Sequence, residues 1–229
     1  ALERAEQLLS ELRELRDVVA GDEAPRGHIR ITAGVSLGHA LLHESLPAFL
    51  LAHPEVSVEV VLTDRHVDLV SERIDLAIRI GKLVDSNLVA QRLGTVGHLV
   101  CAAPDWLAAN GPVLPDNLNA LPRIVDTNQP LAWPLTGPDG SALEVEASGR
   151  YAVNNAHAAR DACAAGLGVA MLPNFVSRAG LERGDLVDAL PGWTGPEFGL
   201  FAVVLERRWV SAAVRSLVDH VRGRLEDAL

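Results

Sequence analysis

Hydrophobic and polar positions recur along this chain with two different periods, and each period predicts one kind of element. In residues 28–33, Ile29 and Ile31 alternate with other residues, which predicts a strand. Residues 36–52 carry apolar residues at helical spacing, which predicts a helix with Leu41, Leu42, Leu46, Phe49 and Leu50 on its inner face. A predicted strand followed by a predicted helix thus begins an alternation of strands and helices.

The same alternation continues to the end of the chain. Further strands are predicted at 56–62, 75–80, 96–102, near 123–126, near 143–153, at 169–172 and at 198–205. Helices are predicted near 105–110, at 156–165 and at 211–225, and the Pro/Gly-rich stretches 111–122 and 134–140 are predicted as surface loops. This order of elements is typical of an α/β fold with mostly parallel sheets, and its length suggests two of them.

Residues 64–94 change period within one short segment. A short helix is predicted from the helical spacing of Val67, Leu69, Val70 and Ile74. Leu76, Ile78 and Ile80 then alternate as in a strand, which ends at Gly81. The polar run at 82–87 is predicted to be a surface connection.

The first 20 residues have a third pattern. Apolar residues follow a heptad spacing at Ala1, Ala5, Leu8, Leu12, Leu15 and Val19, and residues 21–27 read as a linker. The chain begins with Ala1 and has no charged-then-apolar targeting segment, so either a secretory signal or an upstream domain has been removed. The heptad favours a dimerising linker helix that follows an upstream domain, although an amphipathic helix packed on its own domain remains open.

Composition narrows the classes of function. The 229 residues are 48% hydrophobic and carry a formal net charge of −10. Nucleic-acid binding needs a basic face, which this balance disfavours, and no apolar run reaches the roughly 18 residues of a membrane span. Cys101 and Cys163 lie outside any C-x-x-C spacing, so we expect two thiols in apolar surroundings and a reducing cytoplasm, with a disulfide left open.

Gly34-Val35-Ser36-Leu37-Gly38 matches the G-x-S-x-G pattern of a serine hydrolase, with Asp64, Asp75 or Asp126 and His157 or His220 as possible partners. The serine follows the first strand of the chain, however, so no earlier loop exists to supply the oxyanion hole. A serine at a helix N-terminus also suits anion binding, and Asn154-Asn155 repeats this arrangement later. Two ordinary N-caps explain the local sequence equally well.

Three other motifs are weaker indications of a binding site. His39 and His43 share one helix face, but without a third ligand we expect no metal site. Gly166-Leu167-Gly168 follows a helix, so it is predicted to end that helix rather than to bind a dinucleotide, and no cofactor is expected. The tryptophans at 133, 193 and 209 are expected to be packing residues.

Several motifs together resemble the effector-binding (regulatory) domain of a LysR-type transcriptional regulator. They occur in family order at 27–32 (GHIRIT), 46–49 (LPAF), 53–56 (HPEV), 64–81 (DRHVDLVSERIDLAIRIG), 99–104, 165–173 (AGLGVAMLP) and 184–187 (GDLV). The resemblance implies two Rossmann-like lobes of the periplasmic-binding-protein type II, joined by two crossover strands. Lobe I would comprise 26–101 and 205–229 and lobe II 102–204, with residues 1–25 as the linker and dimerisation helix.

The resemblance also implies a function. A small, anionic effector would bind in the cleft between the lobes, lined by Val35, Ser36, Leu37, Thr63, Arg65, Ile80, Gly81, Val100, Cys101, Asn155, Val169 and Phe201. The chain would be a cytoplasmic, non-enzymatic homodimer, and a tetramer in the full-length protein. It would not contact a membrane, and it would reach promoter DNA only through a winged helix-turn-helix absent from this sequence. A periplasmic solute-binding protein remains the alternative, and a serine hydrolase a remote one.

Overall fold

The computed structural model describes residues 24–81, 88–130, 132–205 and 211–228. The chain divides into two compact units. Unit 1 runs to Gly94 and resumes from Leu200 to Ala228, and unit 2 is Thr95–Gly199. The predicted linker helix at 1–25 and the predicted connection at 82–87 lie outside the described residues, apart from residues 24 and 25.

Unit 1 is built on a five-stranded sheet in which the first strands are parallel. The strand order is β2 (Val56–Leu62), β1 (Gly27–Ala33), β3 (Leu76–Gly81), β12 (Phe198–Leu205) and β4 (Leu88–Val96). In the register of these strands, Ala33 lies beside Leu62 of β2 and Ile78 of β3. The carboxyl ends of β1, β2 and β3 therefore meet at one edge of the sheet.

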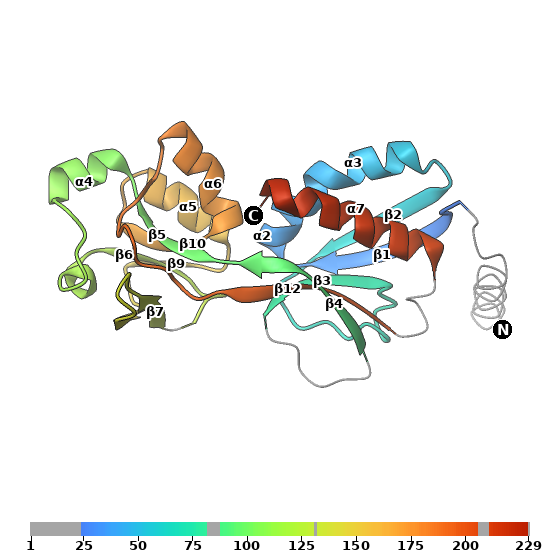
Figure 1. Ribbon diagram of the computed structural model, residues 1–229, viewed down its shortest axis with the longest axis horizontal. Helices are drawn as coiled ribbons and strands as arrows, with labels where there is room; N and C mark the ends of the chain where they lie inside the picture. The colour runs from blue at the N-terminus through green and yellow to red at the C-terminus, as the bar shows by residue number, and fades with distance from the viewer. Residues whose placement is uncertain (1–23, 82–87, 131, 206–210, 229) are drawn as a thin grey trace. The chain divides into compact units, whose positions relative to one another are not determined.

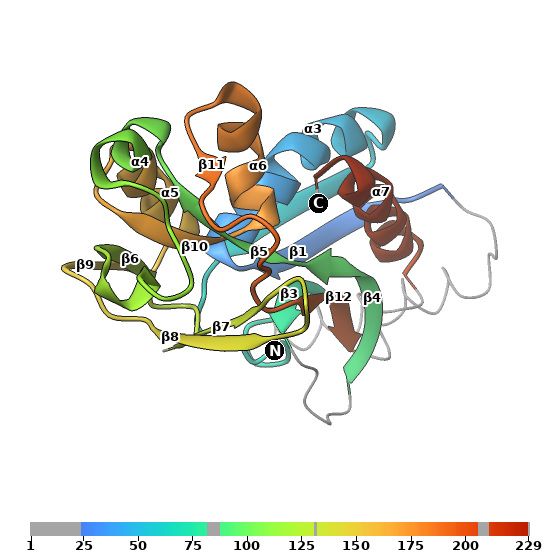
Figure 2. The same cartoon turned by 60° about the vertical axis from the view of Figure 1, so that its left-hand side comes forward.

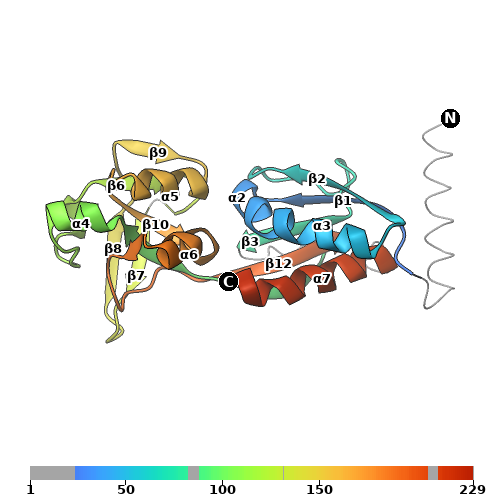
Figure 3. The same ribbon diagram turned by 90° about the horizontal axis from the view of Figure 1, so that it is seen from above.

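Helices cover one face of the unit 1 sheet, as Figures 1 and 3 show. A continuous helical run consists of α2 (Val35–Leu37), the π-helical segment η1 (Gly38–Leu42) and α3 (His43–Ala52). The closing helix α7 (Ala212–Ala228) packs against α3, η1 and β1. By length and composition, Val35–Ala52 passes as a possible membrane span. This is weak evidence, because its inner residues Leu41, Leu42 and Phe49 are buried in unit 1, as expected of a core helix.

Unit 2 contains a second five-stranded sheet. Its order is β11 (Val187–Asp188), β5 (His98–Ala102), β10 (Val169–Pro173), β6 (Arg123–Asp126) and β9 (Tyr151–Val153). Strands β10, β6 and β9 are parallel, whereas β5 is antiparallel to both β10 and β11. The helices of unit 2 are α4 (Pro104–Asn110), α5 (Ala156–Ala164) and α6 (Asn174–Arg183), which Figure 2 labels, and the 3-10 turn η2 (Leu118–Ala120).

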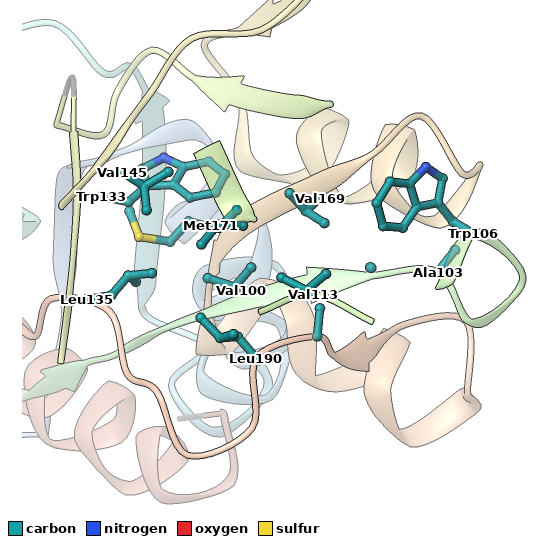
Figure 4. Packing of buried hydrophobic residues seen from close by; sticks show 13 residues of the cluster. Val100, Ala103, Trp106, Val113, Trp133, Leu135, Val145, Val169, Met171 and Leu190 are labelled. Carbon is teal, nitrogen blue, oxygen red and sulfur yellow. The ribbon is translucent and has the colours of Figure 1, made fainter. Parts of the chain in front are cut away.

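A two-stranded hairpin, β7 (Ala132–Thr136) with β8 (Ala142–Glu146), closes the core of unit 2. Trp133, Leu135 and Val145 of this hairpin join a buried apolar cluster with Val100, Val169 and Met171 (Figure 4). Trp133 is only 2% exposed, which confirms its predicted packing role. Trp193 packs partly buried against the same cluster, and the tryptophan at 209 lies outside the described residues.

The structure corrects three of the predicted elements and adds elements that were not predicted. The predicted helix at 67–74 is irregular: residues 69–73 form turns, and Val70 is 59% exposed whereas Val67, Leu69 and Ile74 are buried. Helix α6 and strand β4 were not predicted from the sequence. The predicted strand at 143–153 is two strands, β8 and β9, and the predicted loop at 134–140 includes part of β7.

The boundaries between the two units also differ from those predicted for the two lobes, which were placed after residues 101 and 204. The structure divides the chain after Gly94 and after Gly199. Strand β5 pairs with β10 and β11, and therefore belongs to the sheet of unit 2. Most of β12 lies in the sheet of unit 1. Periodicity alone could not reveal these pairings.

Candidate functional site

The carboxyl edge of the unit 1 sheet joins the loops that follow β1 and β2. The backbone N–H of Thr63 donates to the carbonyl of Ala33 at 2.9 Å, and the N–H of Val35 donates to Oδ1 of Asp64 at 3.0 Å. Asp64 therefore places a carboxylate at the start of the helical run that begins with Val35, where the helix dipole favours negative charge. Among the predicted effector contacts, Thr63 and Arg65 lie in the loop after β2, and Ser36 lies in the first turn of the helical run that follows β1.

The glycines of the G-x-S-x-G motif have a packing explanation. A Cβ atom at position 34 would lie 3.0 Å from Oδ1 of Asp64, and one at position 38 would lie 2.2 Å from Cδ2 of Leu62. A larger side chain at position 38 would therefore require the side chain of Leu62 to move, and one at position 34 would crowd the carboxylate of Asp64. His220, one of the possible partners of a catalytic serine, instead bonds the carbonyl of Ser45 at 2.9 Å. Ser36 is half-buried at the second position of the helical run.

Arg65 is held by an acidic neighbour in the same loop. Its two terminal nitrogens donate to the two carboxylate oxygens of Glu72 at 2.6 and 2.7 Å. This bidentate pair raises the pKa of Arg65 and lowers that of Glu72, in each case chiefly through the hydrogen bonds between them. The positive charge of Arg65 is therefore already balanced by the carboxylate of Glu72.

The other predicted residues of unit 1 lie in or beside the sheet. Ile80 and Gly81 end β3 and are half-buried, and Gly81 has a φ of 141°. Leu37 is buried in the helical run. Phe201 of β12 packs, partly buried, against a cluster that includes Val67, Leu69 and Val203.

Three of the predicted residues of unit 2 are buried in its sheet. Val100, Cys101 and Val169 are at most 2% exposed. The Sγ of Cys163 lies 3.3 Å from the carbonyl oxygen of Cys101, and both thiols are free, as predicted. Burial raises the pKa of both thiols, that of Cys163 to about 12, so neither is a nucleophile near neutral pH.

Asn155 occupies the carboxyl edge of the unit 2 sheet, at the end opposite to Val169. It follows β9 and caps α5, because its Oδ1 accepts from the N–H of Ala158 at 3.0 Å. The N-cap interpretation of Asn155 is therefore confirmed, and its Nδ2 group is not used by that bond.

The sequence analysis missed polar residues at this same edge. Asn128, in the loop after β6, donates from its Nδ2 to the carbonyl of Asn154 at 2.8 Å, and the N–H of Thr127 donates to the carbonyl of Val153 at 2.8 Å. The sequence could have indicated these residues, since the polar run Asp-Thr-Asn-Gln at 126–129 comes at the end of an apolar strand, where open α/β sheets bind ligands.

The histidine pair considered for metal binding lies on the exposed side of the helical run. The rings of His39 and His43 stack with centroids 5.4 Å apart. Within the described part of the chain, no group of three or more His, Cys, Asp or Glu side chains is arranged to hold a metal ion.

Comparison with known families and structures shows to which family this chain belongs. The model of the LysR substrate binding domain matches residues 22–226. The chain is 34% identical over 224 residues to the HTH-type transcriptional regulator PtxR of Pseudomonas aeruginosa, covering 96% of this chain and 72% of that protein. It is 31% identical to the HTH-type transcriptional regulator DmlR of Escherichia coli, covering 94% and 69%.

Solved structures agree with the family match. The full-length structure of the Vibrio cholerae virulence activator AphB, a member of the LTTR family, is similar with a TM-score of 0.78 and 25% identity, covering 96% of this chain and 77% of that one. The regulatory domain of CrgA from Neisseria meningitidis has a TM-score of 0.78 at 22% identity, covering 88% and 100%. The fold is therefore of the periplasmic-binding-protein type II. The relatives are transcriptional regulators rather than enzymes, so the hydrolase interpretation of Ser36 has no support.

Proposed function

Because the chain belongs to the LysR substrate binding domain family, we propose that it senses a small anionic metabolite and so controls DNA binding by the full-length regulator. One observation carries the anionic part of the proposal. The parallel strands β1, β2 and β3 end together, and the segments that follow β1 and β2 place Ser36 in the first helical turn and Thr63 and Arg65 in the neighbouring loop. Open α/β sheets bind ligands at such carboxyl ends, and a helix N-terminus favours anions.

The position of Asp64 supports the proposal that this edge accommodates a carboxylate. The carboxylate of Asp64 already accepts a backbone N–H from the first residue of the helical run. A ligand carboxylate would meet the same dipole, together with the hydroxyls of Ser36 and Thr63. Val35, Ile80, Gly81 and Phe201 complete the proposed surface in unit 1.

In unit 2 we propose Asn155 as the polar contact, through its Nδ2 group. Leu37, Val100, Cys101 and Val169 were also predicted to line the site. Their side chains are buried, so in this proposal they support the strands and the helix rather than donate hydrogen bonds to the ligand.

A ligand screen followed by a matched pair of variants tests the proposal. Small carboxylates and neutral metabolites are screened by thermal unfolding, since a ligand at 100 times its Kd adds about 2.7 kcal/mol of stability. The tightest ligand is then titrated by calorimetry against Ser36→Ala and Ser45→Ala. Ser45 lies further along the same helical run, where its hydroxyl donates to the carbonyl of Leu41 at 2.7 Å.

We expect a carboxylate to emerge from the screen and Ser36→Ala to weaken its binding about ten-fold. Ser45→Ala should leave the affinity unchanged. A ligand without negative charge would contradict the anionic proposal. Equal affinities of the wild-type and Ser36→Ala proteins would remove Ser36 from the site.

We also propose that the chain forms a homodimer through α3, with residues of lobe II of the second copy as the opposing surface. The support is the exposure of apolar side chains on unit 1, where Leu51 of α3 is 86% exposed and Val60 and Leu62 of the edge strand β2 are 37% and 40% exposed. Leu51→Glu should yield a monomer in sedimentation at tens of micromolar. Val70→Glu, at a position 59% exposed in a turn, is the control that should remain dimeric.

The full-length protein is proposed to be a cytoplasmic tetramer in which the heptad segment at 1–20 adds a second contact. Promoter DNA would bind through a winged helix-turn-helix, as the names of the HTH-type relatives suggest. A wild-type chain that is monomeric at tens of micromolar would contradict both the α3 interface and the heptad interpretation.

A further inference from the structure

A second arginine at the carboxyl edge of unit 1 differs from Arg65 in its surroundings. Arg79 extends from β3 across β1, where Nη1 donates to the carbonyl of Thr63 at 2.7 Å and Nη2 donates to Oγ1 of Thr32 at 3.1 Å. The Thr32 hydroxyl in turn donates to the carbonyl of Val61 at 2.8 Å. The guanidinium is thus fixed by neutral oxygens on β1 and at the end of β2.

No ion pair neutralises this guanidinium within the described residues. It is half-buried, and burial lowers the pKa of Arg79, although an arginine stays protonated at physiological pH. Asp64 favours its charge from a distance, but Oδ1 of Asp64 already accepts the N–H of Val35. A partly desolvated cation without a direct counter-ion is costly, and an incoming anion would remove that cost.

The geometry of Arg79 suits a planar anion. A guanidinium has five N–H donors in a rigid fork, and only two are used in the bonds to Thr63 and Thr32. Arg65 differs, since both of its terminal nitrogens and both oxygens of Glu72 are joined in one bidentate pair. The charge of Arg65 is already balanced by the carboxylate of Glu72, whereas the two bonds that hold Arg79 go to neutral oxygens, so an anion at Arg79 would meet a cation with no carboxylate in direct contact.

We propose that Arg79 is the residue that binds the carboxylate of the effector and selects for negative charge. This inference rests on the proposed function, and it adds the group that recognises the anion. The contact would be a bidentate, charge-assisted one, beside the Thr63 loop that the same guanidinium orients.

Carboxylates paired with their amides are suitable probes while the natural effector is unidentified. Benzoate and succinate are compared with benzamide and succinamide in protein labelled with ¹⁵N, and the Nε–Hε signals of the arginines are recorded by NMR. The Arg79 signal is assigned by its loss in Arg79→Lys. The Arg79 signal should move with at least one carboxylate and stay in place with the matched amide.

The affinities of arginine variants then identify the arginine responsible. Arg79→Gln should weaken binding of the responding carboxylate by about ten-fold or more. Arg73→Gln, which removes the same charge from an exposed turn, should not change it. Arg79→Lys should fall between the wild type and Arg79→Gln, because lysine keeps the charge and loses the fork.

Three results would overturn the proposal. The first is a response of the Arg79 signal to amides as strong as its response to carboxylates. The second is a larger loss of affinity in Arg65→Gln than in Arg79→Gln. The third is the absence of any carboxylate response at Arg79. If a carboxylate binds but leaves the Arg79 signal in place, this inference is refuted and the proposed function still stands. The NMR measurement on the wild-type protein also remains informative if Arg79→Gln fails to fold.

Discussion

Gly38 faces Leu62 so closely that a Cβ atom at position 38 would lie 2.2 Å from Cδ2 of the leucine. The contact joins the first helical turns to the end of β2, the two segments whose loops form the carboxyl edge of unit 1. A side chain at position 38 would have to displace the side chain of Leu62, whereas the backbone does not itself call for glycine, since Gly38 has a φ of −63°.

Gly38→Val should lower the free energy of unfolding by about 1–3 kcal/mol, because the branched side chain overpacks the contact with Leu62. Gly223→Ala is the matched control on α7, where nothing lies within 4 Å of an added Cβ. It should raise the free energy of unfolding by about 0.5–1 kcal/mol through helix propensity. Urea unfolding measures both, and a Gly38→Val protein as stable as the wild type would refute the packing explanation.

The two cysteines should be inert in the folded protein. Both side chains are buried, and burial raises the pKa of each thiol, so the thiolate that reacts is scarce. A thiol reagent at pH 7.5 should modify neither in the native state and both in urea. Val70→Cys, at an exposed position, should react at once and serves as the positive control. Rapid labelling of Cys101 or Cys163 in the native wild type would contradict this prediction.

Stability should fall in mild acid because of His98. This histidine is 3% exposed, and burial lowers its pKa against the opposing effect of a hydrogen bond between Nδ1 and the carbonyl of Pro196. Below the pKa of an unfolded histidine, about 6.5, the unfolded chain binds a proton that the folded chain does not. The neutral histidine thus favours the folded state fully only above that pH, and the advantage declines as the pH falls towards the lowered folded pKa.

Urea unfolding of the wild type and of His98→Asn at pH 7.5 and 5.5 measures the contribution of His98 to the free energy of unfolding. Asparagine is chosen because its amide can still donate a hydrogen bond to the Pro196 carbonyl. The wild type should lose up to about 1.4 kcal/mol more than the variant between the two pH values. Carboxylates that titrate in the same range are common to both proteins and cancel in the comparison. An equal loss in both proteins would show that His98 is not the group responsible.

The prediction of elements from the sequence succeeded where one face of an element is buried and the other is not. Strand β1 shows this, with Ile29 and Ile31 buried and His28 exposed. Helix α6 was missed because only Val176, Ser177 and Gly180 are buried on it, and this is no apolar stripe. Strand β4 was missed because most of its residues are half-buried, so alternation is weak.

The candidate site was only partly accessible to the same reasoning. Ser36 and Asn155 could be found because each follows a strand and begins a helix. Arg79 could not, since in the sequence it is one polar residue within an apolar strand. Its significance depends on the register that sets β3 beside β1, with Thr32 next to Ala77, and on the return of the chain at Thr63. Such relations arise only from the folded sheet.

The last prediction concerns DNA. Thirty acidic residues outnumber twenty lysines and arginines in this chain, giving a net charge of −10. Duplex binding depends on phosphate contacts by basic residues, and each contact adds a slope of about −0.9 to log K against log salt. Residues 1–229 should therefore show no salt-sensitive binding in fluorescence anisotropy, even to the regulator's own promoter. The protein extended by its helix-turn-helix should bind the same duplex with a steep salt dependence. Sequence-specific binding by residues 1–229 alone would mean that this domain itself recognises DNA. It would contradict the proposal that DNA binding belongs to a separate helix-turn-helix domain.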